Sequence, residues 1–130
     1  MIYIFAIYTL WTSLSQIKRS YIAEAMDEAV KSPLVRRHGC IIVGGGKVIS
    51  HDHNHYRKGR FSAKCSTDAI NNIGDKTLLR DADLYVVRIG SDHDGNIIIR
   101  GSQPCRTCLP KLLKCMRKYG LRNVFYSVDP

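Results

Sequence analysis

Residues 101–115, with the sequence GSQPCRTCLPKLLKC, place two cysteines three residues apart at the start of a predicted helix. Pro104 precedes Cys105, and the apolar residues after Cys108 recur at helical spacing. The unpaired amides and the macrodipole of a helix N-terminus favour thiolates. The spacing fits a dithiol redox pair, half of a four-ligand structural zinc site, or two of the three protein ligands of a catalytic zinc. The redox pair is disfavoured because this helix comes late, with most of the predicted sheet upstream.

Helices and strands alternate on both sides of this stretch. Apolar residues recur at helical spacing from Tyr21 to Val30, and Pro33 ends that helix. Its other side is predicted to be polar, with Glu24, Asp27, Glu28 and Lys31. The later predicted elements are strands at 40–43 and 47–50, a helix at 62–73, strands at 84–89 and 97–99, a helix to about 118 and a strand at 123–126. This order predicts one α/β sheet covered by helices.

Composition and charge bound the class of protein. A chain of 130 residues with 45% hydrophobic residues predicts one compact globular domain. Five cysteines are an odd number, which favours metal binding and free thiols in a reducing, intracellular compartment over a disulfide framework. Cys40 and Cys115 are expected to pack as small buried hydrophobic side chains.

A net charge of +9 predicts an anionic partner, such as a nucleotide, a nucleic acid or an acidic protein surface. The basic residues are scattered along the chain and form no dominant run. The last predicted helix has a basic face that is either a solvated surface or a contact for phosphate; its residues are Lys111, Lys114, Arg117 and Lys118.

The N-terminal segment differs from the rest of the chain. Its first fourteen residues are apolar and uncharged, but a membrane-spanning helix needs about 20 residues. It also lacks the positive start and the small-residue cleavage site of a signal peptide. We therefore predict no transmembrane span, an N-terminal arm at residues 1–20 and a folded domain at 21–130. The arm is expected to dock on its own domain or on a protein partner, with a cleaved or anchoring segment as the alternative.

Four segments, taken in order, resemble the cytidine/deoxycytidylate deaminase superfamily. HGCIIVGGGKVIS (38–50) is similar to its first hairpin, and SAKCSTDAI (62–70) occupies the place of its S-x-H-A-E-x-x-A-I helix. QPCRTC (103–108) matches its P-C-x-x-C motif, and KYGLRNVFYSVD (118–129) is similar to its closing helix and strand. The resemblance covers about residues 21–129. It implies a three-layer α/β sandwich with a central sheet of about five strands flanked by helices.

The resemblance also implies a zinc site in which a His or Cys and two cysteines hold the metal. A Glu two residues after the first ligand then shuttles protons while zinc-bound hydroxide attacks the base. Here Lys64 stands at the His position and Ser66 at the Glu position. A lysine ammonium repels a metal cation. A serine hydroxyl does not titrate near pH 7, so it cannot act as a general acid or base there. Losing the general acid and base costs at least ~10²–10⁴-fold in rate.

Two hypotheses remain open for the metal. A shift of one residue in register brings Cys65 to the first ligand position, so that Cys65, Cys105 and Cys108, with or without a fourth ligand, hold Zn²⁺ as a structural centre. The Glu position then becomes Thr67, which still lacks a carboxylate. In the second hypothesis no metal binds, and the Lys64 ammonium is the positive charge opposite the thiolates.

Residues 51–55, HDHNH, form a second cluster of polar side chains. On an extended strand His51, His53 and His55 would share a face that suits a metal, but a solvated loop after the hairpin is the favoured interpretation. The resemblance implies that Asn54 contacts the sugar or base of a substrate. Asp52 stands where the family has Gly, and its charge would narrow the pocket and repel phosphate.

The sequence therefore predicts a protein of the deaminase-like class without hydrolytic activity. Such a protein would act as a binding or assembly module, contacting partners through its N-terminal arm and basic surface. The first alternative is an active zinc-dependent deaminase of a cytosine or adenine nucleoside, nucleotide or RNA. A dithiol redox protein is the second.

Overall fold

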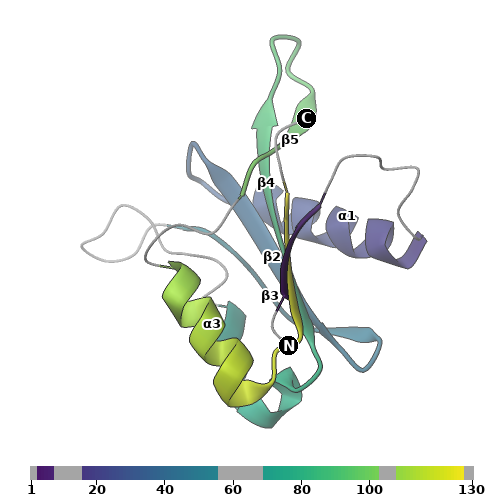
Figure 1. Cartoon of the computed structure of the whole chain (residues 1–130). Coiled ribbons are helices and arrows are strands. Elements are labelled where there is room, and N and C mark those ends of the chain that lie inside the picture. Colours follow the sequence, from purple (N-terminus) through teal and green to yellow (C-terminus); the bar gives the residue numbers. More distant parts are fainter. Residues whose placement is uncertain (1–2, 8–15, 56–68, 103–107, 128–130) are drawn as a thin grey trace.

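The computed structural model describes residues 3–7, 16–55, 69–102 and 108–127, which form a mixed α/β fold around a six-stranded sheet (Figure 1). The strands are β1 (Tyr3–Ile7), β2 (Arg37–Gly44), β3 (Lys47–His53), β4 (Asp83–Ser91), β5 (Ile97–Arg100) and β6 (Asn123–Ser127). Their order across the sheet is β1-β6-β4-β2-β3, and β5 also pairs with β4. β2 is antiparallel to β3 and β4, whereas β6 is parallel to both β4 and β1.

β4 is the central strand. β2 pairs along one of its edges from Asp83 to Ile89. The other edge is shared, because β6 pairs with residues 83–86 and β5 pairs with residues 88–91. β4 therefore connects the hairpin of β2 and β3 to β5, to β6 and, through β6, to β1.

Helices cover the two faces of the sheet (Figure 1). α1 (Gln16–Val30) and α3 (Cys108–Tyr119) contribute to two separate groups of buried apolar side chains. The group under α1 includes Ile22, Ala25, Ala29, Ile41, Val43, Tyr85, Val87 and Ile89. The group under α3 includes Cys40, Ile42, Leu84, Val86, Leu112, Met116 and Val124. This is the predicted three-layer α/β sandwich, and the fold class is confirmed.

The alternation of side chains along β2 and β4 explains why the two groups form. Successive residues of a strand point to opposite faces, so Ile41 packs under α1 while its neighbour Ile42 packs under α3. Both strands are covered on both faces, and a strand in that position needs a nearly continuous apolar run. The apolar segment from Cys40 to Val43 is such a run, and all four of its side chains are buried.

α1 packs very close to β2 at Gly39. A β-carbon added to Gly39 would lie 2.0 Å from the carbonyl oxygen of Ala25 and 2.3 Å from the amide nitrogen of Ala29. Both alanines are fully buried. The helix therefore approaches the strand through residues with the smallest side chains.

In the N-terminal segment the helix begins earlier than predicted, and the arm takes one of the two docking arrangements expected for it. α1 begins at Gln16 rather than near Tyr21, so the predicted boundary of the arm falls inside the helix. Residues 3–7 form β1, which pairs in parallel with β6 in register from Tyr3 with Asn123 to Ile7 with Ser127. The backbone of this segment thus joins the sheet of its own chain.

The helix predicted at 62–73 lies largely outside the described residues. Residues 69–71 are helical and are followed by a turn, so the helix ends slightly earlier than predicted. A short 3₁₀-helix (Lys76–Leu79) then leads to β4, with the Asp75 side chain accepting a hydrogen bond from the amide of Thr77. None of the described helices is both long and apolar enough to cross a membrane.

Candidate functional site

The predicted zinc-site residues fall mostly outside the described part of the chain. This holds for Lys64, Cys65, Ser66 and Cys105. Cys108 is the first residue of α3, so the second cysteine of the motif stands at a helix N-terminus. Its side chain, like the other two thiols, is not among the described groups.

Asn54, the predicted substrate contact, follows directly after the end of β3 and is only 6% exposed. Its side-chain oxygen accepts a hydrogen bond from the amide of His38 at 2.8 Å. Its side-chain nitrogen donates to the carbonyl oxygen of Arg36 at 2.6 Å. The Asn54 amide nitrogen also donates to the carbonyl oxygen of His38 at 3.1 Å. Asn54 therefore joins the end of β3 to the start of β2.

The imidazole of His38 lies next to this junction. Its Nδ1 is 3.4 Å from the side-chain nitrogen of Asn54 and 3.4 Å from the carbonyl oxygen of Arg36. Burial, reinforced by the positive charges of Arg88 and Arg36, holds the pKa of His38 below its ordinary value. An uncharged imidazole beside Asn54 adds no positive charge to attract a phosphate at this point.

Asp52, at the position where the resemblance expects glycine, is held by three neighbours. One carboxylate oxygen accepts a hydrogen bond from the amide of His53 at 2.8 Å, and the other accepts one from the side chain of Asn72 at 3.3 Å. Its backbone oxygen lies 3.6 Å from the sulfur of Cys40. These contacts fix a negative charge two residues from Asn54.

Two of the three histidines in residues 51–55 lie in a strand rather than in a solvated loop, so the favoured interpretation is wrong for His51 and His53; His55 follows the end of β3. His51 and His53 belong to β3, and both contact Glu28 of α1. Their Nδ1 atoms lie 2.6 Å and 3.2 Å from the two carboxylate oxygens of Glu28. Within the described residues, no three His, Cys, Asp or Glu side chains are placed to hold a metal ion.

Glu28 was predicted on the polar side of its helix, but the structure buries it at 6% exposure. Burial alone would raise its pKa. Hydrogen bonds from Lys31 and His53, together with the charge of His51, outweigh burial and hold the pKa of Glu28 below its ordinary value. Glu28 lies three residues after the buried Ala25 and directly before the buried Ala29. Residues three apart share one side of a helix, and this spacing is the signal that could have revealed the burial of Glu28. The contacts of Glu28 with His51 and His53 hold α1 against β3. They give a structural role to two of the three histidines in residues 51–55.

The chain matches no known protein family and no curated protein sequence. Among solved structures, it is similar to RibD (form 1) of Acinetobacter baumannii, with a TM-score of 0.49 and 13% sequence identity. The match covers 85% of this chain and 35% of the RibD chain. This chain therefore spans about a third of the length of that protein.

Proposed function

We propose that this chain is a binding or assembly module of the deaminase-like class that does not catalyse hydrolytic deamination. The observation that carries the proposal is the role of Asn54. The residue that should contact a sugar or base is buried, and its side chain already bonds Arg36 and His38 of its own chain. A side chain that holds two backbone groups in place is a poor recognition group for a substrate.

The sequence at the proton-shuttle position supports the same conclusion. Ser66 and, in the alternative register, Thr67 offer a hydroxyl where a carboxylate must exchange protons with substrate. A hydroxyl side chain does not titrate near neutral pH, whereas an efficient general acid or base has a pKa close to the working pH. The chain therefore lacks the group that would both activate water and protonate the leaving amine.

Zinc is the metal that the resemblance implies, and the donor set of the chain fits it by type. Three thiols, from Cys65, Cys105 and Cys108, match the sulfur ligands that Zn²⁺ prefers in structural sites. α3 begins at Cys108, where the helix N-terminus favours the thiolate form. We propose that these residues, together with a fourth ligand, hold zinc as a structural ion. Bound zinc would supply charge neutralisation and a cross-link between the start of α3 and the segment around Cys65.

Metal content tests the zinc proposal. Protein purified without chelators is expected to carry about one equivalent of zinc, as a structural site does. Cys105→Ser is expected to lose most of that zinc, whereas Cys115→Ser, which alters a cysteine in the middle of α3, is expected to keep it. Elemental analysis decides the outcome. Zinc below about a tenth of an equivalent in the wild type would contradict the proposal and favour Lys64 as the charge opposite the thiolates.

We also propose that the N-terminal arm contacts a protein partner. One edge of β1 pairs with β6, so such a contact would use the opposite edge of β1. An unpaired strand edge offers amide and carbonyl groups to a strand from another chain. This contact would be an extension of the sheet.

The absence of deamination is tested by ammonia release. Cytidine, deoxycytidylate and tRNA incubated with the protein are each expected to release no more ammonia than a protein-free blank. The reason is the missing proton shuttle, whose loss costs ~10²–10⁴-fold in rate. Cys105→Ala is the matched control. Ammonia release by the wild type that this variant abolishes would overturn the proposal in favour of a zinc deaminase.

A further inference from the structure

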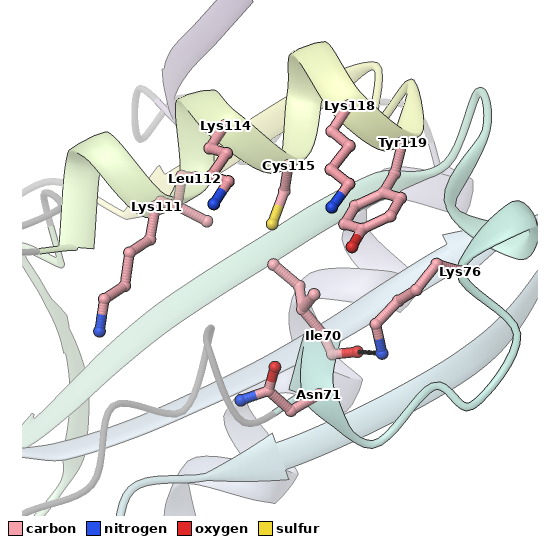
Figure 2. Close-up of a pocket in the computed structure, with 9 residues that line it drawn as sticks. All are labelled: Ile70, Asn71, Lys76, Lys111, Leu112, Lys114, Cys115, Lys118 and Tyr119. Atoms are coloured by element: carbon pink, nitrogen blue, oxygen red, sulfur yellow. Dashed lines mark hydrogen bonds between the residues drawn. The ribbon is translucent and has the colours of Figure 1, made fainter.

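A pocket of about 330 Å³ lies between α3 and the chain segment that contains Ile70, Asn71 and Lys76. Figure 2 shows Lys114, Cys115 and Lys118 projecting from α3 toward Ile70 and Lys76 across this space. The volume lies at the lower end of the range for small-molecule sites, which runs from about 300 to 1,000 Å³. The pocket uses neither Asn54 nor any of the residues proposed to hold zinc.

Four of the residues lining this pocket are lysines, and none of its described lining residues is acidic. Three of the lysines come from α3 at helical spacing; they are Lys111, Lys114 and Lys118. Like charges three or four residues apart on a helix destabilise it, by about 0.2–0.5 kcal/mol for each pair. The three ammonium groups on α3 therefore repel one another, and no described carboxylate lines the pocket to offset this repulsion.

Helix electrostatics explain some of these lysines but not all. Lys118 lies in the last turn of α3, where the helix dipole favours a cation, and its ammonium is 5.3 Å from the centre of the Tyr119 ring. Lys111 lies near the start of the same helix, where the dipole disfavours a cation. Lys111 and Lys114 are exposed and make no hydrogen bond or ion pair with any described residue. Their ammonium groups are available to a ligand.

Lys76 is the one lysine of the four that is fixed in place. Its ammonium donates a hydrogen bond to the carbonyl oxygen of Ile70 at 3.0 Å (Figure 2). It also donates one to the carbonyl oxygen of Ile73. Both carbonyls lie at or just beyond the C-terminal end of the helical residues 69–71, where the helix dipole favours a cation. The pocket therefore has one anchored positive charge facing three others on α3.

The floor of the pocket is apolar. Ile70 and Leu112 are 4% and 2% exposed, and the half-buried ring of Tyr119 lies at one end. Cys115 lies among the lysines, which lower its pKa, but burial outweighs them and raises the pKa of the thiol above its ordinary value. The thiol is thus neutral at physiological pH and adds no negative charge. A ligand would meet an apolar surface below and ammonium groups around it.

We propose that this pocket binds a small organic phosphate with several negative charges close together, of the size and charge of a nucleoside di- or triphosphate. Ammonium groups bind phosphate oxygens through charge-assisted hydrogen bonds, and the apolar floor suits the uncharged part of the ligand. A nucleic-acid backbone spaces its charges along a groove. This site, by contrast, is local and concave. The inference rests on the binding role proposed above and gives that role a ligand class.

Calorimetric titration of the full chain tests this proposal, with inorganic pyrophosphate, ATP, adenosine and a single-stranded oligonucleotide as probes. The wild type is expected to bind pyrophosphate and ATP but not adenosine. The double variant Lys111→Gln/Lys114→Gln is expected to bind at least about tenfold more weakly for each charge-assisted hydrogen bond it loses. Lys47→Gln removes an exposed lysine at the start of β3 and is expected to leave affinity unchanged.

Three results would overturn the proposal. The first is no binding of either phosphate probe by the wild type. The second is an equal loss of affinity in Lys47→Gln and in the double variant, which would show diffuse attraction rather than a site. The third is binding of a single-stranded oligonucleotide with none of pyrophosphate, which would assign the lysines to nucleic acid. Because ammonia release is measured separately, each of these results would leave the absence of deamination standing.

Discussion

Gly39→Ala is expected to lower the free energy of unfolding by about 3 kcal/mol or more, at the upper end of the range for overpacked sites. The added β-carbon would lie 2.0 Å from the carbonyl oxygen of Ala25 and 2.3 Å from the amide nitrogen of Ala29. These are backbone atoms of α1, so no side chain can rotate to relieve the clash. The whole helix must move away from β2, which would open the buried group under it.

Gly74→Ala is the matched control for this variant. Apart from its two chain neighbours, no described residue has a heavy atom within 4 Å of a β-carbon at Gly74, so the substitution is expected to change stability by no more than about 0.5 kcal/mol. Urea denaturation followed by circular dichroism measures both variants. Equal midpoints for the two would contradict the close packing of α1 on β2.

Asn54→Ala is expected to lower the free energy of unfolding by about 2 kcal/mol, because it removes two partly buried hydrogen bonds, each worth about 0.5–1.5 kcal/mol. The substitution removes the acceptor of the His38 amide at 2.8 Å and the donor to the Arg36 carbonyl at 2.6 Å. Both groups belong to the backbone at the start of β2. The loss should therefore appear as a lower midpoint of unfolding without any ligand present.

Asn72→Ala provides the comparison, because Asn72 is exposed and makes one long hydrogen bond, of 3.3 Å, with Asp52. It is expected to change stability by less than about 0.5 kcal/mol. A result in which Asn54→Ala is as stable as Asn72→Ala would contradict the structural role of Asn54. It would return Asn54 to the substrate-contact role that the resemblance implies.

Much of the sheet was predictable from the sequence because its strands carry strong local signals. The strands predicted at 40–43 and 84–89 fall within β2 and β4, whose apolar runs follow from burial on both faces. The last predicted helix and strand agree with α3 and β6 to within a few residues. The structure extends β2 and β4 at both ends, where less apolar residues continue the pairing.

β1 could not be assigned from its own residues. Its apolar character alone fits a strand, a docking segment or an anchor equally well. What makes residues 3–7 a strand is the free edge of β6, which is formed by residues at the opposite end of the chain. A pairing between segments this far apart leaves no trace in the local sequence pattern.

The histidine cluster shows the opposite error. A solvated loop is the favoured interpretation of His51 and His53 because histidine metal sites are rare in proteins. In the structure β3 is an edge of the described sheet, and its histidines find a carboxylate partner in Glu28. A buried carboxylate is stable here because three side chains, those of Lys31, His51 and His53, compensate its loss of water. Only the tertiary structure brings these groups together.

The chemistry of the candidate site could be predicted from the sequence, whereas its contacts could not. Through its resemblance to the deaminases, the sequence places Ser66 and Lys64 where a proton shuttle and a metal ligand are expected. It does not show that Asn54 is bound to its own backbone, because that depends on the register of β2 with β3. The lysine pocket likewise joins α3 to residues about forty positions earlier in the chain.

Analysis of nucleotide recovered after a single turnover tests the central claim most directly. Deoxycytidylate is incubated for a long period with an excess of zinc-loaded protein, so that even one slow turnover per molecule would convert it, and the base is then identified by mass spectrometry. We predict that all of the cytosine is recovered unchanged. Conversion to uracil by the wild type, absent from a parallel incubation with Cys105→Ala, would show that the chain is a deaminase and contradict this account.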